Sequence, residues 1–456
     1  MSTLTRKLPV MMGVMGVVAF AVTGLAACAP GGSNPAPSAS LGSVSKTIPK
    51  DKITLTEWDQ NTDGGSSKAQ GTLNKAFEAK YPNVTIKRVS RSFSDLKTTL
   101  KLAISGSNPP DVVQANQGYP DMGAFVKGGL LRPVDDYAKL YAWTSYYPSS
   151  LLKLNTFSSD GGTWQAGNLY GVSQTGELVG VYYNKKVLDQ LGVPAPKTLA
   201  DLDADMAKAK TAKVLPLSYG DLDKSPGIHL YGVVQAAIAG ADKVNNLVTG
   251  TSGSWTDPDN VKAATTIQGW AKNDYLTAGS GGVSRDDALA TFAKGGCAFM
   301  VDGTWQQATL EADMGKSNVG FATLTPEGAP APVTEGGEGL AWAITSKAKH
   351  ADAAAAYINF ITDAKAAQTL LDTGNLPAVL PSGYTAPSGT LAADITDSYT
   401  KIAKANTVVP YLDYATPTFY DTLTAGMQNL VAGQTTPAQF TGSLQTDYAA
   451  FTKGRS

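Results

Sequence analysis

The sequence predicts an α/β protein in which mainly parallel sheets are flanked by helices. Three observations predict this class. Strand-like alternation of apolar and polar residues recurs along the chain, helical patterns of about a dozen residues separate the strands, and a second region of the same kind opens near Val179. Strands that alternate with helices favour βαβ units, and the crossover connections of such units make neighbouring strands parallel.

The first α/β region starts at Lys52. In order, its predicted elements are a strand at 53–58, a helix around 73–81, a strand at 84–89, a helix around 96–104 and a strand at 111–114. In open α/β sheets, ligands bind beyond the carboxyl ends of the strands. Residues 57–59 and 114–117 occupy those ends, so they are the first place to look for a site.

The second region predicts a strand at 179–183, a helix at 199–210, strands at 297–301 and 340–344, a helix at 353–361, and a helical final part. Thr198 and Asp201 are spaced as a capping box, in which each side chain accepts a hydrogen bond from the other residue's backbone N–H. This pair predicts that the helix begins at Leu199.

The first 27 residues are typical of a secretory signal peptide. Arg6 and Lys7 precede an apolar run at 10–21, and the segment closes on Leu25-Ala26-Ala27-Cys28. The run is too short for a permanent membrane span. A cysteine after Leu-Ala-Ala is similar to a bacterial lipobox, which predicts diacylglyceryl modification of Cys28. We therefore expect a protein on the outer face of the cell membrane, held by its lipid anchor only.

Residues 28–50 are predicted to be a lipidated flexible tether, because residues 30–45 consist mainly of Gly, Ser, Pro, Ala and Asn. The full sequence is close to neutral, with 37 Lys and Arg against 38 Asp and Glu. This balance argues against a nucleic-acid partner, which needs a dense basic surface. Once Cys28 is modified, Cys297 is the remaining thiol, so no intrachain disulfide is expected.

Signatures of catalysis are scarce. His229 and His350 match no zinc-binding spacing, and no nucleophile elbow, phosphate-binding loop or dinucleotide fingerprint is found. The run Ser94-Asp95-Leu96-Lys97 fits Ser-x-x-Lys, but the companion motifs of that enzyme class are missing. We therefore expect no enzyme activity, no cofactor and no metal.

The chain does offer aromatic rings and polar side chains near predicted strand ends. A sugar presents an apolar face edged by hydroxyls, so it suits a flat ring beside carboxylates and amides. The candidate rings are Trp58, Tyr119, Trp164, Trp305 and Trp342, and the candidate polar groups are Asp59, Asn116, Gln117, Glu177, Asp302 and Glu338. Core packing is the alternative for each ring, and it is the preferred one for Trp342, which lies within an apolar strand.

Several stretches, taken in order, resemble one family. They are Phe77-Glu78-Ala79-Lys80-Tyr81-Pro82-Asn83-Val84, Asn108-Pro109-Pro110-Asp111-Val112-Val113, Leu169-Tyr170-Gly171-Val172, Tyr182-Tyr183-Asn184-Lys185, Phe292 to Met300 with Trp305, and Gly374-Asn375-Leu376-Pro377-Ala378. Together they resemble the family 1 extracellular solute-binding proteins of ATP-binding-cassette importers, the group that contains maltose-binding protein.

The resemblance implies a two-lobe periplasmic-binding-protein-like fold whose lobes close on a ligand about a hinge. It places residues 51–176 and 334–378 in lobe 1, and residues 177–333 and 379–456 in lobe 2. By position in the family, Trp305 would stack on a sugar, Glu177 would contact sugar hydroxyls, and Trp58-Asp59 and 114–117 would form ligand loops of lobe 1. Further expected ligand contacts are Gly337 and Glu338 at the return to lobe 1, and Phe419, beside Tyr420, as a last aromatic contact.

The resemblance also implies partners: a carbohydrate ligand of oligosaccharide size and the permease of an importer, with the receptor itself a monomer. Gly227-Ile228-His229 replaces an aromatic segment of the family, which leaves the ligand's length and identity open. Two other functions remain as alternatives. The first is a surface glycosidase, which would need two acids at a working distance. The second is a receptor for a peptide, a polyamine or iron, although two histidines and no cysteine cluster disfavour a transition metal.

Overall fold

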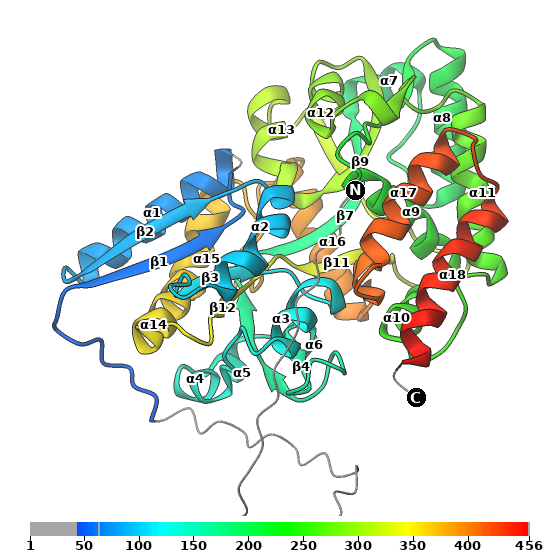
Figure 1. Ribbon diagram of the computed structural model, residues 1–456. Coiled ribbons are helices and arrows are strands. Elements are labelled where there is room, and N and C mark those ends of the chain that lie inside the picture. The colour runs from blue at the N-terminus through cyan, green and yellow to red at the C-terminus, as the bar shows by residue number, and fades with distance from the viewer. Residues whose placement is uncertain (1–42, 63, 455–456) are drawn as a thin grey trace, which may run out of the picture. The chain divides into compact units, whose positions relative to one another are not determined.

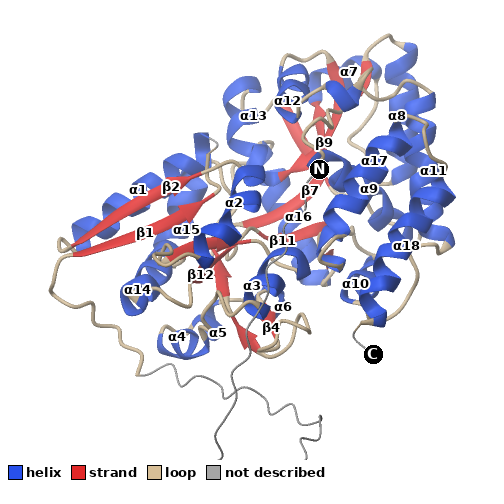
Figure 2. Ribbon diagram, in the orientation of Figure 1, coloured by secondary structure: helices blue, strands red, loops and turns tan. Residues whose placement is uncertain are grey.

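Two large sheets organise the protein, and each has its own helices (Figures 1 and 2). The computed structural model describes residues 43–62 and 64–454, all of which belong to one compact unit. The strands are β1 (Ile53–Asp59), β2 (Val84–Ser90), β3 (Val112–Ala115), β4 (Thr156–Phe157), β5 (Asn168–Leu169), β6 (Gly171–Ser173), β7 (Gly176–Asn184), β8 (Leu215–Ser218), β9 (Cys297–Gly303), β10 (Val319–Ala322), β11 (Thr334–Glu338), β12 (Ala341–Ile344) and β13 (Val408–Val409).

The helices are α1 (Gly64–Lys80), α2 (Phe93–Ser105), α3 (Ala124–Lys127), α4 (Asp135–Leu140), α5 (Trp143–Tyr146), α6 (Ser149–Leu154), α7 (Lys185–Leu191), α8 (Leu199–Thr211), α9 (Ser225–Ala239), α10 (Ala241–Thr249), α11 (Pro258–Lys272), α12 (Arg285–Ala293), α13 (Gln307–Met314), α14 (Ala351–Ile361), α15 (Ala364–Asp372), α16 (Leu391–Ala405), α17 (Phe419–Val431) and α18 (Pro437–Lys453). Shorter helical turns are η1 (Tyr119–Gly123), η2 (Ser280–Gly282), η3 (Thr304–Gln306) and η4 (Leu412–Ala415).

The first lobe is built on the sheet β2-β1-β3-β12-β6. Successive side chains of a strand point to opposite faces, so Ile53 and Leu55 of β1 are buried on one face together with Phe77 of α1 and Tyr357 of α14. Helices α1, α14 and α15 pack together although they are far apart in the sequence (Figure 1). On the other face, Leu96 of α2 lies in the same core cluster as Val113.

The second lobe is built on β13-β11-β7-β9-β8, with β10 paired to β7. Helices α8 and α9 pack on this sheet, and α11, α17 and α18 form a further layer over α9. The predicted capping box at the start of α8 is confirmed, because Thr198 and Asp201 exchange both hydrogen bonds. Tyr182 and Phe292 belong to a separate cluster on the other face of the sheet.

Both sheets are mixed, although the sequence predicts mainly parallel ones. The parallel pairs are β1–β2, β1–β3, β8–β9 and β11–β13. Strand β12 is antiparallel to β3 and β6, and β7 is antiparallel to β9, β10 and β11. The cause is that β12 and β7 enter their sheets directly from the other lobe and not through a helical crossover, and only such crossovers impose parallel pairing.

The chain passes between the lobes three times, and the three passages are hydrogen-bonded to one another. Between β6 and β7 the passage is residues 174–175, and between β11 and β12 it is residues 339–340. The third passage includes Leu376, whose carbonyl accepts a hydrogen bond from the backbone N–H of Gly176 at 2.9 Å. Because β11 pairs with β7 and β13, the second passage lies at Gly339 and not at residue 333, where the sequence analysis divides the lobes.

Residues 43–50 lie on the first lobe, although the sequence analysis includes them in the tether. Val44 and Ile48 pack against the core cluster of that lobe, and the backbone N–H of Ser45 donates to Asp352 Oδ1 at 3.2 Å. The predicted signal peptide, Cys28 and the rest of the tether lie outside the described residues. None of the helices in the described part of the chain is long and apolar enough to cross a bilayer.

Candidate ligand-binding site

A cavity of about 380 Å³ is lined by residues of both lobes and of the passages between them. Small-molecule sites in proteins usually occupy about 300–1,000 Å³. The first lobe contributes the loop after β1, the start of α2 and the end of β3, and the second contributes the starts of α9 and α12, η3 and η4. The site therefore forms where the ends of strands and the beginnings of helices from both lobes converge.

Trp305 of η3 is a half-buried ring in the cavity wall. The guanidinium of Arg285 lies 5.2 Å from its ring centroid, and the ring of His229 lies at 5.3 Å with a tilt of 53°. Arg285 is itself held by Asp302, which accepts hydrogen bonds from Nε at 2.9 Å and Nη2 at 2.8 Å. A bidentate pair of this kind has a fixed geometry, so the indole is supported by a rigid neighbour.

Because Gly303 has no side chain, the ring of Trp305 can pack directly against its Cα. A Cβ built on Gly303 would lie 2.2 Å from two ring carbons of Trp305, much closer than van der Waals contact. The backbone of Gly303 is extended, with φ −88° and ψ 166°, which any residue can adopt. Glycine is therefore required here by the ring and not by the backbone.

His229 is positioned by a buried carboxyl. Its Nδ1 lies 2.6 Å from Glu335 Oε1, and Glu335 of β11 has no exposed surface. Gly232 makes room for this carboxyl, since a Cβ there would lie 2.1 Å from Glu335 Oε2. Burial raises the pKa of Glu335 to about 7, against the opposing effect of His229. Glu335 in turn raises the pKa of His229 above its ordinary value, although burial works in the other direction.

Two tyrosines near η4 connect the segment 411–414 to the rest of the cavity. The hydroxyl of Tyr411 donates to Glu177 Oε2 at 3.0 Å, and burial raises the pKa of Glu177 to about 7. The hydroxyl of Tyr414 lies 2.9 Å from Asn116 Oδ1 and 3.0 Å from Gln117 Oε1, both at the end of β3 in the first lobe. Glu177, Asn116 and Tyr411 thus present oxygen and nitrogen atoms to the cavity in fixed positions.

The charged groups that line the cavity are mostly acidic. They are Glu177, Asp223, Asp286, Asp413, His229 and Arg285. The two basic groups are engaged, Arg285 by Asp302 and His229 by Glu335. In residues 43–62 and 64–454, no group of three or more His, Cys, Asp or Glu side chains is placed to hold a metal ion. The site is therefore equipped with rings and hydrogen-bonding groups, and both of its basic side chains are already paired with carboxyl groups.

The family model of the bacterial extracellular solute-binding proteins matches residues 59–368, more than half of the chain. The chain belongs to this family.

Relatives agree with that membership along most of the chain. A multiple sugar-binding protein of Streptococcus mutans is 24% identical over 386 residues, covering 81% of this chain and 82% of that protein. An uncharacterised ABC transporter extracellular-binding protein of Pyrococcus horikoshii is 26% identical over 379 residues, covering 80% and 79%. Among solved structures, a chitin oligosaccharide binding protein superposes with a TM-score of 0.75 at 21% identity, covering 88% of this chain and all of that one. This last similarity shows the two-lobe solute-binding fold.

Three of the residues predicted for the site line the cavity of this solute-binding protein: Asn116, Glu177 and Trp305. Two others lie directly behind the wall. Asp302 holds Arg285, and the side-chain amide of Gln117 donates to the Gly339 carbonyl at 2.8 Å while its Oε1 faces Tyr414.

The structure places the other predicted residues away from the cavity lining. Asp59 is buried against Arg88, and the ring of Trp58 points to the opposite face of β1, under Arg91. Tyr119 packs against Phe157 and Trp164 in the core. Glu338 is buried and accepts a hydrogen bond from Asn155 Nδ2 at 2.6 Å.

Gly337 and Phe419, the last two residues predicted as ligand contacts, also lie outside the cavity lining. Gly337 lies in β11 with φ +114°, and a Cβ there would lie 3.2 Å from Leu154 Cδ1. Phe419 is fully buried against Trp255, whereas the next residue, Tyr420, lines the cavity. Both belong to α17, where consecutive side chains point about 100° apart, so a shift of one residue changes core into site. Trp342, expected in the core, is fully buried.

Sequence reasoning missed Arg285, Tyr411, Tyr414 and the pairing of His229 with Glu335. Arg285 begins α12, and nothing in the sequence indicates that it reaches Asp302. The run Pro410-Tyr411-Leu412-Asp413-Tyr414 did carry a signal, because two tyrosines and an acid follow a proline in a segment without helical periodicity. Such a segment is typical of a loop that carries function.

The buried carboxyls predict that the unliganded protein loses stability as the pH rises. Burial raises the pKa of Glu335 and of Asp221 to about 7, whereas a carboxyl in the unfolded chain titrates near 4. The folded protein therefore holds these protons more tightly, and this contribution is complete below about pH 4 and is lost as the pH rises through 7. We expect the midpoint of urea unfolding to be lower at pH 8 than at pH 5.5.

Two variants isolate the cause. In Asp221→Asn the amide oxygen can still accept the hydrogen bond that Gly227 N–H donates at 2.8 Å, but the group no longer titrates. We expect a smaller difference between pH 5.5 and pH 8 in Asp221→Asn and in Glu335→Gln than in the unmodified protein. A midpoint that increases from pH 5.5 to pH 8 in the unmodified protein would contradict the assignment.

Proposed function

We propose that this solute-binding protein captures a neutral carbohydrate in the cavity between its lobes and passes it, chemically unaltered, to the permease of an ATP-binding-cassette importer. The observation that carries the proposal is the half-buried indole of Trp305 in the cavity wall, next to the carboxyl of Glu177, the amide of Asn116 and the hydroxyl of Tyr411. A ring covers the apolar face of a sugar, and the polar groups accept or donate the hydrogen bonds of its hydroxyls.

The charge of the cavity supports an uncharged ligand. Both basic groups in the wall are already paired with carboxylates, and four acidic groups remain. An acidic sugar or a phosphate would be desolvated next to these carboxylates without a free cation to compensate it. The name of the Streptococcus relative and that of the solved oligosaccharide-binding protein are consistent with the same ligand class.

Membrane attachment is a further part of the proposal, and it rests on the sequence. We propose that residues 1–27 are removed and that Cys28 is lipidated, which would hold the receptor at the outer surface of the membrane where a permease can receive the sugar. Two acyl chains give stable anchoring, since each buried CH₂ contributes about 0.8 kcal/mol.

A thermal-shift panel tests the ligand class. The sugars are galactose, maltotriose, xylotriose, stachyose and the trimer of N-acetylglucosamine, with galacturonate and spermidine as charged comparisons. Binding to the folded state alone stabilises it by about 2.7 kcal/mol at a concentration of one hundred times Kd, which raises the melting temperature by several degrees. We expect at least one neutral sugar to do this and galacturonate to have no effect.

The same incubations address the two alternatives. If spermidine raises the melting temperature and no sugar does, the carbohydrate assignment is wrong. Chromatography of the sugar after incubation should recover it unchanged. The appearance of shorter saccharides would show a glycosidase instead.

A further inference from the structure

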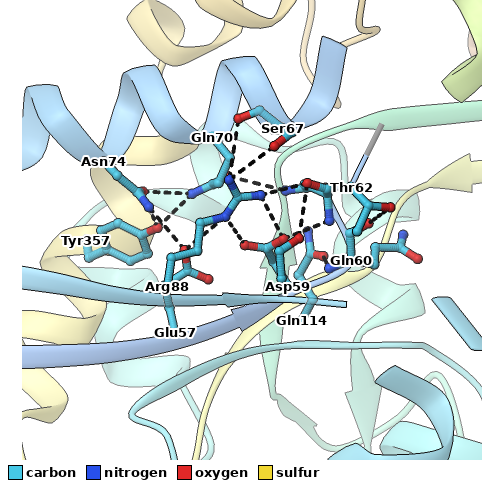
Figure 3. Close-up of polar contacts among 12 residues, drawn as sticks. Glu57, Asp59, Gln60, Thr62, Ser67, Gln70, Asn74, Arg88, Gln114 and Tyr357 are labelled. Carbon is cyan, nitrogen blue, oxygen red and sulfur yellow. Dashed lines mark hydrogen bonds and ion pairs between the residues drawn. The ribbon is translucent and has the colours of Figure 1, made fainter. Parts of the chain in front are cut away.

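Arg88 of β2 lies next to the loop of Gln60, Asn61 and Thr62 (Figure 3). These three loop residues line the cavity, whereas Arg88 does not. Its side chain is 20% exposed and is surrounded by polar groups from β1, α1 and the loop. A partly buried guanidinium needs partners for most of its five N–H groups. The hydrogen bonds that hold Arg88 therefore also hold its partners in position.

The guanidinium joins the end of β1 to the loop that follows. Asp59 accepts hydrogen bonds from Arg88 Nε at 2.5 Å and Nη2 at 3.0 Å, and Nη2 also donates to the backbone carbonyl of Asn61 at 2.7 Å. Asp59 Oδ1 in turn accepts from the backbone N–H of Asn61 at 2.7 Å. Both backbone polar groups of Asn61 are therefore held by one ion pair, which fixes the path of the loop at this residue.

Neighbouring side chains hold the loop on its remaining sides. The backbone N–H of Gln60 donates to Gln114 Oε1 at 2.8 Å, and the side chain of Asn61 approaches Gln70 Oε1 at 3.4 Å. Gln70 is fully buried and donates to Tyr357 Oη at 2.7 Å (Figure 3). The loop is thus tied to β3 and α1 as well as to β2, and Gln70 of α1 is in turn anchored on α14.

Glu57 completes the charge balance under the loop. It is fully buried, and Asn74 Nδ2 donates to its Oε1 at 3.1 Å. Burial, and secondarily the charge of Asp59, raise the pKa of Glu57 well above its usual range. Glu57 Oε1 lies 3.7 Å from Arg88 Nε, farther than the two Asp59 oxygens, so Asp59 is the principal partner of the guanidinium.

We propose that Arg88 is a positioning residue for ligand binding: through Asp59 and the carbonyl of Asn61 it sets the conformation of residues 60–62, and with it the affinity of the cavity. The proposal rests on the proposed function, because it assumes that a solute occupies the cavity these residues line. Lysine cannot replace arginine in this role, since one ammonium cannot span Asp59 and the Asn61 carbonyl in a fixed fork.

The test compares Arg88→Met and Arg88→Lys with Arg132→Met. Arg132 lies in the same lobe, above the ring of Tyr137 at 6.0 Å, and does not line the cavity. Affinity is measured by calorimetry at 15 °C with the neutral sugar that gives the largest thermal shift in the panel. In parallel, hydrogen–deuterium exchange of the unliganded protein follows the amides of residues 60–62, with strand β9 as an internal reference.

In Arg88→Met, we expect the amides of residues 60–62 to exchange faster while those of β9 stay protected. We also expect this variant to bind the sugar about tenfold more weakly, because each hydrogen bond lost from the loop lowers the equilibrium constant by a factor of about two to ten. Arg88→Lys should show the same local change with a smaller loss of affinity, and it serves if Arg88→Met does not fold. Arg132→Met should resemble the unmodified protein in both measurements.

The two measurements separate this proposal from the proposed function. Unchanged exchange at residues 60–62 in both Arg88 variants would show that Arg88 does not position the loop, whether or not any sugar binds. Faster exchange with unchanged affinity would show that the loop does not set affinity. If no panel sugar binds the unmodified protein, the carbohydrate assignment fails, and the exchange measurement still decides whether Arg88 positions the loop.

Discussion

Replacing Trp305 with alanine should weaken sugar binding by about 10- to 100-fold, because stacking and the burial of one indole face together contribute a few kcal/mol. The ring is only half-buried, and its neighbours Arg285 and His229 are each held by their own carboxyl partner. The fold should therefore survive the loss of the ring. Calorimetric titration with the best panel sugar measures the affinity, and urea unfolding measures the stability.

Trp58→Ala is the matched control for this change. Trp58 is also half-buried and also lies under a guanidinium, with Arg91 Cζ 4.6 Å from its ring centroid, but it is outside the cavity lining. We expect the two variants to lose a similar amount of stability. The affinity of Trp58→Ala for the sugar should stay within about threefold of that of the unmodified protein, which corresponds to a difference in binding free energy of less than about 1 kcal/mol. Equal loss of affinity in both variants would refute the assignment of Trp305 as the stacking ring.

Adding one methyl group at Gly303 should have an effect on binding close to that of removing the Trp305 ring. A Cβ at Gly303 would lie 2.2 Å from the indole, so the ring must move by about 1 Å or more, and displacements of that size at a binding site are costly. The backbone of Gly303 needs no special conformation. We expect Gly303→Ala to fold and to bind the panel sugar about tenfold more weakly.

Gly296→Ala provides the comparison for the methyl group. Gly296 precedes the same strand, β9, and a Cβ there meets no heavy atom within 4 Å. The affinity of Gly296→Ala for the sugar should equal that of the unmodified protein. If Gly303→Ala binds normally, the position of the indole does not matter for affinity. Near-ultraviolet circular dichroism, which reports the surroundings of tryptophan, should change in Gly303→Ala and stay the same in Gly296→Ala.

The sequence predicted most of the elements that place the site. Strands β1, β2, β3, β7, β9 and β12 and helices α2, α8 and α14 are confirmed to within a few residues, whereas α1 begins at Gly64, nine residues before the predicted start. They could be predicted because each buries one face, which imposes a period on its apolar residues. The direction of β12 could not be predicted in this way, because pairing with β3 and β6 depends on where the chain returns from the other lobe.

The site itself was predicted in part. Trp305 follows β9 and Asn116 follows β3, so the rule that sites lie beyond strand ends indicated two residues that line the cavity; their contact with a ligand stays a prediction. The same rule indicated Trp58, which does not line the cavity, since the alternation of β1 turns its ring to the face opposite Arg88. Arg285, Tyr411 and Tyr414 come from a helix start and from a segment between α16 and α17, whose approach to the cavity depends on the packing of the whole second lobe.

Strand β12 has a consequence for how the molecule is assembled. It lies between β3 and β6, yet it is synthesised long after both, once the chain has passed through the second lobe from β7 to β11. A nascent chain that stops before residue 341 therefore exposes two unpaired strand edges, which are sites of aggregation. Many multidomain proteins fold one domain after another as the chain is synthesised from the amino terminus. This protein cannot fold its first lobe completely before the second has been made. For the same reason, no single proteolytic cut releases an intact lobe.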